Sequence, residues 1–225
     1  MKKLTVILLT LVLCLFAASC SGDEPVTSPD PTPAATEQAE KPDPVSFDTV
    51  IEEYEAAVRE GLDPGQMSER GLSFLLAQFL AENKQEQAGY FVDDIDGDAQ
   101  DELVIAADSK DPFYKGAVFA VYEMQDAKPV KKLTSEARDI WYWVGDGKLL
   151  NVFSGSAFDT NCRIVSADDL SLIEAVRYDS EADPETPWKH YEGGEWSPAT
   201  EEECQIAAAQ MYSLKTAPVI TPFGN

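Results

Sequence analysis

The sequence predicts an α+β fold with two N-terminal helices, an antiparallel β-meander of about seven to eight strands, and one C-terminal helix. Three observations support this prediction. Apolar residues recur at helical spacing before residue 83, short β-like runs separated by turn residues follow residue 90, and a capping box starts at Thr200. Because short connections join the β-like runs, we expect antiparallel pairing rather than parallel strands joined by crossover helices.

Two helices are predicted at the start of the domain. The first has Ser46 or Asp48 as its N-cap and Gly61 as its stop, and its apolar positions are Phe47, Val50, Ile51, Tyr54, Val58 and Leu62. Residues 63–65, Asp-Pro-Gly, are typical of a turn. The second helix ends near Asn83, and its apolar positions are Met67, Leu72, Leu75, Leu76, Phe79 and Leu80. Both apolar stripes are expected to face the core.

Eight β-like runs follow, each bounded by turn residues. They cover residues 102–107, 117–124, 130–134, 139–144, 148–154, 160–166, 170–178 and 188–192. The capping box then pairs Thr200 with Glu203 and places acidic residues at the positive end of the last predicted helix. Residues 217–225, which contain two prolines, are predicted to form a loose tail of the single domain 46–225.

Residues 1–20 are predicted to be a targeting segment. Lys2 and Lys3 precede an apolar run that ends in Ala17-Ala18-Ser19-Cys20. This pattern resembles a bacterial lipoprotein signal, although Ala17 stands where that signal usually has a larger aliphatic residue. The resemblance implies cleavage before Cys20, lipidation of its thiol, and anchoring on the extracytoplasmic face of the cell membrane. The alternative is an ordinary secretory peptide, cut near Ala18.

Residues 21–45 are predicted to be a disordered tether. Prolines stand among Thr, Ala and acidic residues, and Val26 and Val45 are the only large aliphatic side chains. Such a segment buries too little apolar surface to offset the entropy of ordering it. Its prolines favour extended conformations, so it would act as a spacer between the membrane and the domain.

The chain is strongly acidic, with 17 basic and 41 acidic residues and a net charge of -24. Such a surface repels nucleic acid and anionic membrane, so we exclude both as partners of the folded domain. One histidine cannot build a His-based metal site, and no Gly-x-Ser-x-Gly elbow or phosphate-binding loop is present. These patterns favour a non-enzymatic protein that binds or scaffolds at the cell envelope, with a glycan or protein partner that the sequence does not name.

Two cysteines remain once the targeting segment and the lipidated cysteine are set aside. Cys162 and Cys204 would meet an oxidising environment in an exported domain, which permits a disulfide between them. The alternative is two separate buried thiols.

The most specific pattern is the acidic loop, residues 94–102. Hard cations take six to eight oxygen ligands, and alternating carboxylates in a tight turn can supply several of them. The candidate ligands are Asp94, Asp96, Asp98, the backbone carbonyl of Gln100, and Glu102. An all-protein oxygen cage favours Ca²⁺ over Mg²⁺. The alternative is an acidic turn whose carboxylates face water.

The spacing resembles the nine-residue calcium loops of integrin-type (FG-GAP-like) β-propeller repeats, with Glu102 as the final acid. Those loops usually have glycine at the sixth position, where the backbone tends to need a positive φ, and here the residue is Ala99. An alanine held there costs on the order of 1 kcal/mol.

A broader stretch resembles lipid-anchored surface proteins of Gram-positive bacteria, which mostly have no assigned function. The segments that carry the likeness are 47–54, 89–98, 101–105 and 138–142, with a later Gly155-Ser156 turn. The resemblance implies an exported, surface-held and calcium-stabilised protein, and it implies no activity.

Two tryptophans provide an alternative function. Trp141 and Trp143 alternate in one predicted strand and therefore lie on the same face. Together with Trp188 and Trp196 they would either form an aromatic platform for a sugar ring or pack the sheet against the helices. A glycan-binding module, or a glycoside-active enzyme using two of the many carboxylates, is therefore the second hypothesis.

Overall fold

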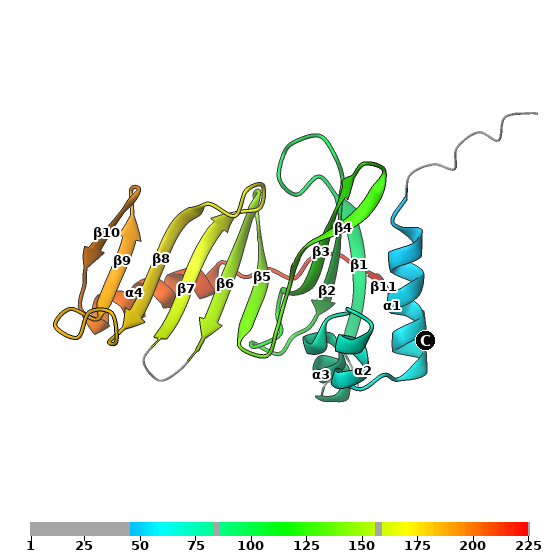
Figure 1. Cartoon of the computed structure of the whole chain (residues 1–225), viewed down its shortest axis with the longest axis horizontal. Helices are drawn as coiled ribbons and strands as arrows, with labels where there is room; N and C mark the ends of the chain where they lie inside the picture. Colours follow the sequence, from blue (N-terminus) through cyan, green and yellow to red (C-terminus); the bar gives the residue numbers. More distant parts are fainter. Residues whose placement is uncertain (1–45, 83–85, 156–158, 225) are drawn as a thin grey trace, which may run out of the picture. The chain divides into compact units, whose positions relative to one another are not determined.

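The computed structural model describes residues 46–82, 86–155 and 159–224, and the predicted signal peptide and tether lie outside these residues. In this part of the chain the fold is a large antiparallel sheet with four helices, so the α+β prediction holds in outline (Figure 1). The helices are α1 (Asp48–Glu60), α2 (Pro64–Glu69), α3 (Phe74–Glu82) and α4 (Glu201–Ser213). No helix of the described segments is long and apolar enough to cross a membrane.

The sheet has eleven strands rather than seven to eight. They are β1 (Gln87–Asp93), β2 (Glu102–Asp108), β3 (Ala117–Gln125), β4 (Lys128–Thr134), β5 (Asp139–Gly145), β6 (Lys148–Ser154), β7 (Asp159–Ser166), β8 (Leu172–Asp179), β9 (Trp188–Glu192), β10 (Glu195–Pro198) and β11 (Thr221–Pro222). Their order is β10-β9-β8-β7-β6-β5-β3-β2-β1-β11, and β4 pairs with β3 beside this path. The eight predicted runs correspond to β2–β9. The apolar, strand-like residues 89–92 before the acidic loop lie in β1, whereas β10 and β11 were not predicted.

Several helix termini follow local sequence signals. The predicted N-cap of the first helix, Ser46 or Asp48, is wrong, because Phe47 occupies that position and makes no side-chain cap hydrogen bond. Gly61 closes α1 with φ 67°, as expected for a left-handed C-cap. The predicted turn at residues 63–65 instead starts α2, because Asp63 accepts a hydrogen bond from the Gln66 amide at 2.9 Å. The single second helix predicted up to Asn83 is therefore wrong. Two helices, α2 and α3, occupy that stretch, with Gly71 at φ 72° between them.

One edge of β3 is shared by two strands. Its first residues, Ala117 and Val118, pair with β5, whereas Ala120 to Gln125 pair with β4. The fully buried Ser135 lies at the junction, where its hydroxyl accepts from the Trp141 amide at 2.9 Å and donates to the Val118 carbonyl. This side chain satisfies backbone groups at the point where the ladder changes partner.

The C-terminal segment is not the loose tail predicted for residues 217–225. Strand β11 pairs with Gly89 and Tyr90 of β1, and Phe223 is only 5% exposed. The Phe223 ring stacks on Tyr54 of α1 with centroids 6.0 Å apart. Gly89 permits this approach, since a Cβ atom there would lie 2.1 Å from the Thr221 carbonyl oxygen. The prediction failed because a two-residue strand has no periodicity to detect.

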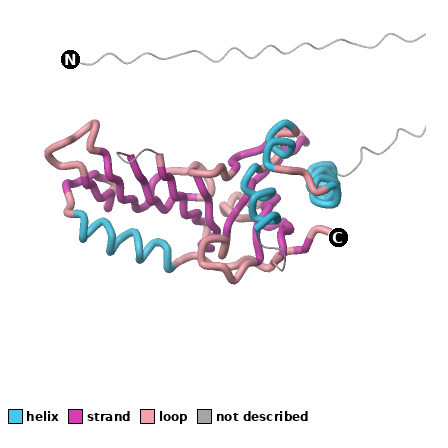
Figure 2. Tube along the Cα trace, turned by 90° about the horizontal axis from the view of Figure 1, so that it is seen from below, coloured by secondary structure: helices cyan, strands magenta, loops and turns pink. Residues whose placement is uncertain are grey.

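The two faces of the sheet bury different clusters. The helix-side cluster joins the helices to inward residues such as Leu103, Ile105 and Phe119. Figure 2 shows the long helix α4 lying along one side of the strands. The alternate residues point to the opposite face and form the loop-side cluster: Ile95, Val104, Ala106, Val118, Val121, Leu133, Trp141, Leu149, Val165 and Ala167.

Candidate metal centre

The acidic loop connects β1 to β2, which pair up to Asp93 and Glu102. Its backbone turns on two residues with positive φ, Gly97 at 89° and Ala99 at 70°. The predicted positive φ at Ala99 is therefore confirmed. The Asp94 carboxylate accepts hydrogen bonds from the amides of Gly97 at 2.7 Å and Ala99 at 3.0 Å, so it organises the turn.

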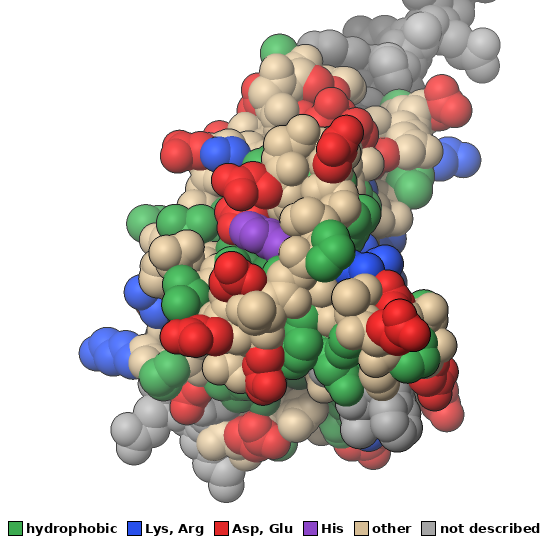
Figure 3. Space-filling view, turned by 90° about the vertical axis from the view of Figure 1, so that its left-hand side faces the viewer, with side chains coloured by type: hydrophobic (Ala, Val, Ile, Leu, Met, Phe, Trp, Pro, Cys, Tyr) green, Lys and Arg blue, Asp and Glu red, His purple; other side chains and the backbone are tan. Residues whose placement is uncertain are grey.

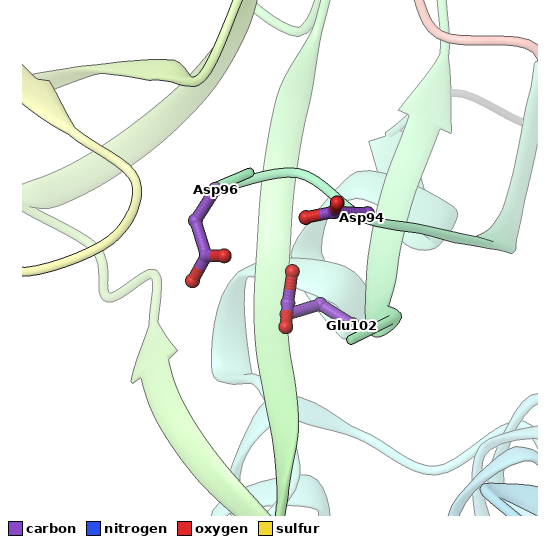
Figure 4. A group of neighbouring side chains, drawn as sticks. All are labelled: Asp94, Asp96 and Glu102. Carbon is purple, nitrogen blue, oxygen red and sulfur yellow. The ribbon is translucent and has the colours of Figure 1, made fainter. Parts of the chain in front are cut away.

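Three carboxylates of this loop converge, as Figure 4 shows. Oxygen atoms of Asp94, Asp96 and Glu102 lie within 4.8 Å of one another, and the group can hold a metal ion. Asp94 is exposed, the Asp96 side chain is 4% exposed, and Glu102 is 2% exposed. Solvent can therefore reach the site at Asp94, whereas the protein covers it at Glu102.

The predicted ligand Asp98 does not join this group of side chains, and the backbone carbonyl of Gln100 stays a prediction. Asp98 accepts hydrogen bonds from the backbone amide of Gln100 at 2.7 Å and from its side-chain amide at 3.0 Å. Both residues line an adjacent hollow of 220 Å³ together with Glu102 and Glu123. Asp98 and Gln100 are therefore near the three carboxylates, but their side chains are paired with each other.

Lys132 on β4 belongs to the site, although no pattern in the sequence predicted it. Its ammonium group lies 3.1 Å from a carboxylate oxygen of Asp96 and 3.1 Å from one of Glu123. Its side chain is only 14% exposed. The available signal was a lysine-rich strand in an acidic chain, but nothing local shows that this strand lies beside the acidic loop.

The surroundings shift the pKa values of the charged groups. The pKa of Glu102 is raised to about 7, mainly by burial and also by the charges of Asp96 and Asp98, whereas the Ile95 amide and Lys132 oppose the shift. Burial lowers the pKa of Lys132, but its bonds to Asp96 and Glu123 outweigh burial and raise the pKa overall. A hydrogen bond from Gln125 and the charge of Lys132 lower the pKa of Glu123.

The donor set fits a hard cation. All the converging groups are carboxylate oxygens, which are the ligands that hard divalent ions prefer. With all three carboxylates ionised, the single ammonium group of Lys132 leaves two uncompensated negative charges. Like charges so close together repel one another unless a cation or a proton neutralises them.

The loop is also part of the loop-side cluster. Ile95, between the two aspartates, is 3% exposed and packs in that cluster. Its amide donates to a Glu102 carboxylate oxygen at 3.1 Å. The position of the carboxylates and the packing of Ile95 therefore depend on the same backbone segment.

The remaining predicted residues lie elsewhere. Trp141 is 6% exposed in the loop-side cluster, and Trp143 is half-buried against Phe91 with ring centroids 5.6 Å apart. The prediction of an aromatic platform is wrong for Trp141, whose ring is packed inside the protein. Trp141 and Trp143 do not pack against helices either, because they lie on the face opposite to the helices.

The two cysteines are free, buried thiols rather than a disulfide. Burial raises the pKa of Cys162 to about 12 and also raises that of Cys204. Both groups are therefore neutral thiols at physiological pH. The predicted lipidation site, Cys20, lies outside the described part of the chain.

A scan of protein-family models found no match to the chain, and searches of curated proteins and of solved structures found no similar protein.

Proposed function

We propose that this chain is a non-enzymatic surface protein, anchored by a lipid on Cys20 to the extracytoplasmic face of the cell membrane, in which Ca²⁺ holds the acidic loop in place. The observation that supports calcium binding is the convergence of Asp94, Asp96 and Glu102 within 4.8 Å. The lipid anchor is supported by the signal-like sequence before Cys20. A binding or scaffolding role at the cell surface is supported by the spacer between Cys20 and the domain. The domain would bind or scaffold a partner at the cell envelope.

Calcium suits the site better than magnesium does. Ca²⁺ accepts six to eight oxygens in flexible geometry, whereas Mg²⁺ demands an octahedron and keeps several waters. Asp94, Asp96 and Glu102 would supply the first ligands. Rotation of Asp98 away from Gln100 would add a fourth carboxylate, and the Gln100 carbonyl would add a further oxygen. The exposure of Asp94 leaves room for water to complete the coordination.

The proposed ion has a structural role. Because Ile95 lies between Asp94 and Asp96, fixing the two carboxylates also fixes the apolar side chain that covers the loop-side cluster. Binding to the folded state alone then stabilises the protein in proportion to the logarithm of calcium concentration.

Calorimetric titration with Ca²⁺ tests this proposal in the mature chain carrying Cys20→Ser, which keeps it soluble. We expect saturable binding and a rise in the melting temperature at millimolar Ca²⁺. Glu102→Gln keeps the shape and the acceptor for Ile95 but removes the charge, so it should weaken binding at least tenfold. Asp101→Asn is the matched control, since Asp101 is exposed and lies outside the converging group. Absence of heat and of any melting shift with the unsubstituted loop would exclude the site.

The anchor has a separate test. The unsubstituted protein should partition with membranes and incorporate labelled fatty acid, and Cys20→Ser should abolish both. A Cys20→Ser protein that stays in the membrane fraction would contradict lipid anchoring while leaving the calcium site untouched.

A glycan-binding role is the second candidate, carried by Trp196, one of the four tryptophans that the sequence offered for an aromatic platform. Trp196 of β10 is 37% exposed and lies against Tyr191, with ring centroids 5.4 Å apart. An exposed tryptophan ring of this kind can stack on a sugar ring. Retention of the protein on immobilised envelope polysaccharide, lost in Trp196→Ala but not in Trp143→Phe, would support this role.

A further inference from the structure

Helix α4 leaves a cavity of 310 Å³ between itself and the strands that it covers. The floor is a row of cross-strand neighbours, Val152 on β6, Cys162 on β7 and Val176 on β8. The roof includes Cys204 and Ala208 of α4. This cavity lies on the face opposite to the acidic loop, because its floor belongs to the helix-side cluster.

One wall of the cavity is aromatic. Trp188 and Tyr178 pair across β9 and β8, and their ring centroids are 4.6 Å apart. Aromatic and aliphatic walls with a few polar groups are typical of small-molecule sites, which begin at roughly 300 Å³. The remaining polar contacts with the cavity come from uncharged side chains such as Ser154 and Gln205.

The lining carries no ionised group that points inward. The thiols of Cys162 and Cys204 are neutral, because burial raises both pKa values. Arg177 also borders the cavity, but it alternates with Val176 along β8 and therefore leaves the sheet on the opposite face. There its guanidinium group lies 4.6 Å from the centre of the Trp196 ring.

Although the whole chain has a net charge of -24, the side chains that point into this cavity are uncharged. The cavity should therefore prefer an uncharged ligand. Burying an ionised group without a partner costs far more than burying an apolar one. Size also limits the ligand, since an apolar cavity of about 150 Å³ is enough for one benzene molecule. A space about twice as large accommodates a molecule of roughly ten to fifteen heavy atoms.

We propose that the cavity between α4 and strands β6–β9 is a binding site for a small, uncharged, mainly apolar molecule of the size of a bicyclic aromatic compound. This site is independent of the proposed calcium site and of the membrane anchor.

Indole, which is neutral and bicyclic, is the probe. In the mature chain with Cys20→Ser, indole should bind saturably in ligand-detected NMR and raise the melting temperature. Indole-3-carboxylate should bind at least tenfold more weakly, because its charge would be buried. Protein NMR gives a local readout: indole should shift the side-chain N–H signal of Trp188 and leave that of Trp141, in the loop-side cluster, unchanged.

A substitution that fills the cavity, compared with a matched substitution outside it, distinguishes a loss of indole binding from a general loss of stability. Ala208→Leu places extra volume in the cavity and should weaken indole binding at least tenfold, whereas Ala209→Leu on the exposed side of α4 should not change it. If Ala208→Leu does not fold, Ala208→Met repeats the test with a more adaptable side chain.

Three results would overturn the proposal. The first is that the unsubstituted protein does not bind indole saturably. The second is that indole shifts the N–H signal of Trp141 but not that of Trp188. The third is that Ala208→Leu and Ala209→Leu bind indole with equal affinity. A change in sedimentation with Ala208→Leu, without any indole binding, would instead identify the cavity as an interface between copies.

Discussion

The two faces of the sheet are covered in different ways. On the helix side, α1 to α4 bring large side chains such as Tyr54 and Phe79 onto the strands, and these side chains are fully buried. On the loop side, the only cover from the β1–β2 connection is Ile95, held between charged groups. One face of the sheet is thus covered by apolar side chains of the helices. On the other face, the position of the covering residue Ile95 depends on the charges of the carboxylates beside it. The stability of packing on the helix side should therefore not depend on Ca²⁺, whereas the stability of packing on the loop side should increase when Ca²⁺ is added.

The acidic surface seen at the β10 end of the sheet emphasises this difference. Figure 3 shows acidic side chains spread over that end of the molecule, where they face solvent. At the acidic loop, by contrast, the Asp96 side chain is 4% exposed and Glu102 is 2% exposed. Burial, rather than the number of acids, is what makes the loop a candidate cation site.

The largest expected effect is on the helix side. Phe79→Ala removes a fully buried ring that lies 5.0 Å from Tyr114 and 5.5 Å from Phe119, between centroids. We expect the free energy of unfolding to fall by about 3–5 kcal/mol. Urea denaturation should give the same loss with and without Ca²⁺. A loss that calcium reverses would show that the two faces are not independent.

The second effect is on the loop side and should depend on calcium. Lys132→Met removes the ammonium group that pairs with Asp96 and Glu123, and it leaves buried carboxylates without a cation. Without Ca²⁺ we expect a loss of about 3 kcal/mol. Added Ca²⁺ should restore part of this loss, because the ion supplies the missing positive charge. Lys128→Met, on an exposed position of the same strand, is the control. Equal losses with and without the ion would argue against an ion at this site.

A third substitution tests the C-terminal part of the helix side. Gly89→Ala would place a Cβ atom 2.1 Å from the Thr221 carbonyl oxygen, so β11 must move. The expected cost is about 1–3 kcal/mol, as for other overpacked positions. Hydrogen exchange should show the loss locally, at the Phe223 amide that donates to Ala88. Unchanged protection of that amide would mean that the C-terminal strand is not held as described.

The smallest effect concerns the strained turn. Ala99→Gly relieves a φ of 70° and should stabilise the apo protein by up to about 1 kcal/mol. The reciprocal Gly97→Ala, at φ 89° with open space around the missing Cβ, should destabilise it by a similar amount through backbone strain alone. Urea midpoints measure both. If the two substitutions change stability in the same direction, strain is not the governing term.

Local patterns predicted much of the fold. The capping box at Thr200 is confirmed by hydrogen bonds of 2.7 Å and 3.2 Å with Glu203, and the helical spacing that includes Tyr54 is confirmed as a core stripe. The carboxylate spacing correctly grouped Asp94, Asp96 and Glu102. These signals are readable because each lies within one element or one turn.

The features that escaped prediction all depend on distant partners. Lys132 reaches the acidic loop from a strand that no local pattern places there. Phe223 is buried only because Gly89 lets the C-terminal strand approach β1. Asp98 was grouped with the other carboxylates by spacing, but a local bond to Gln100 holds it aside. Sequence periodicity carries no information on any of these choices.

The stacked pair of Tyr54 and Phe223 has a consequence for how fast the domain folds. The two rings belong to opposite ends of the described segments, so their contact closes a loop that contains the whole sheet. Closing such a loop carries an entropic cost that must be met before the contact stabilises the chain. Proteins rich in contacts of this kind have high contact order and fold slowly. The contact between Tyr54 and Phe223 therefore forms only when α1 and the C-terminal segment have both reached β1, so it adds to the contact order of the domain.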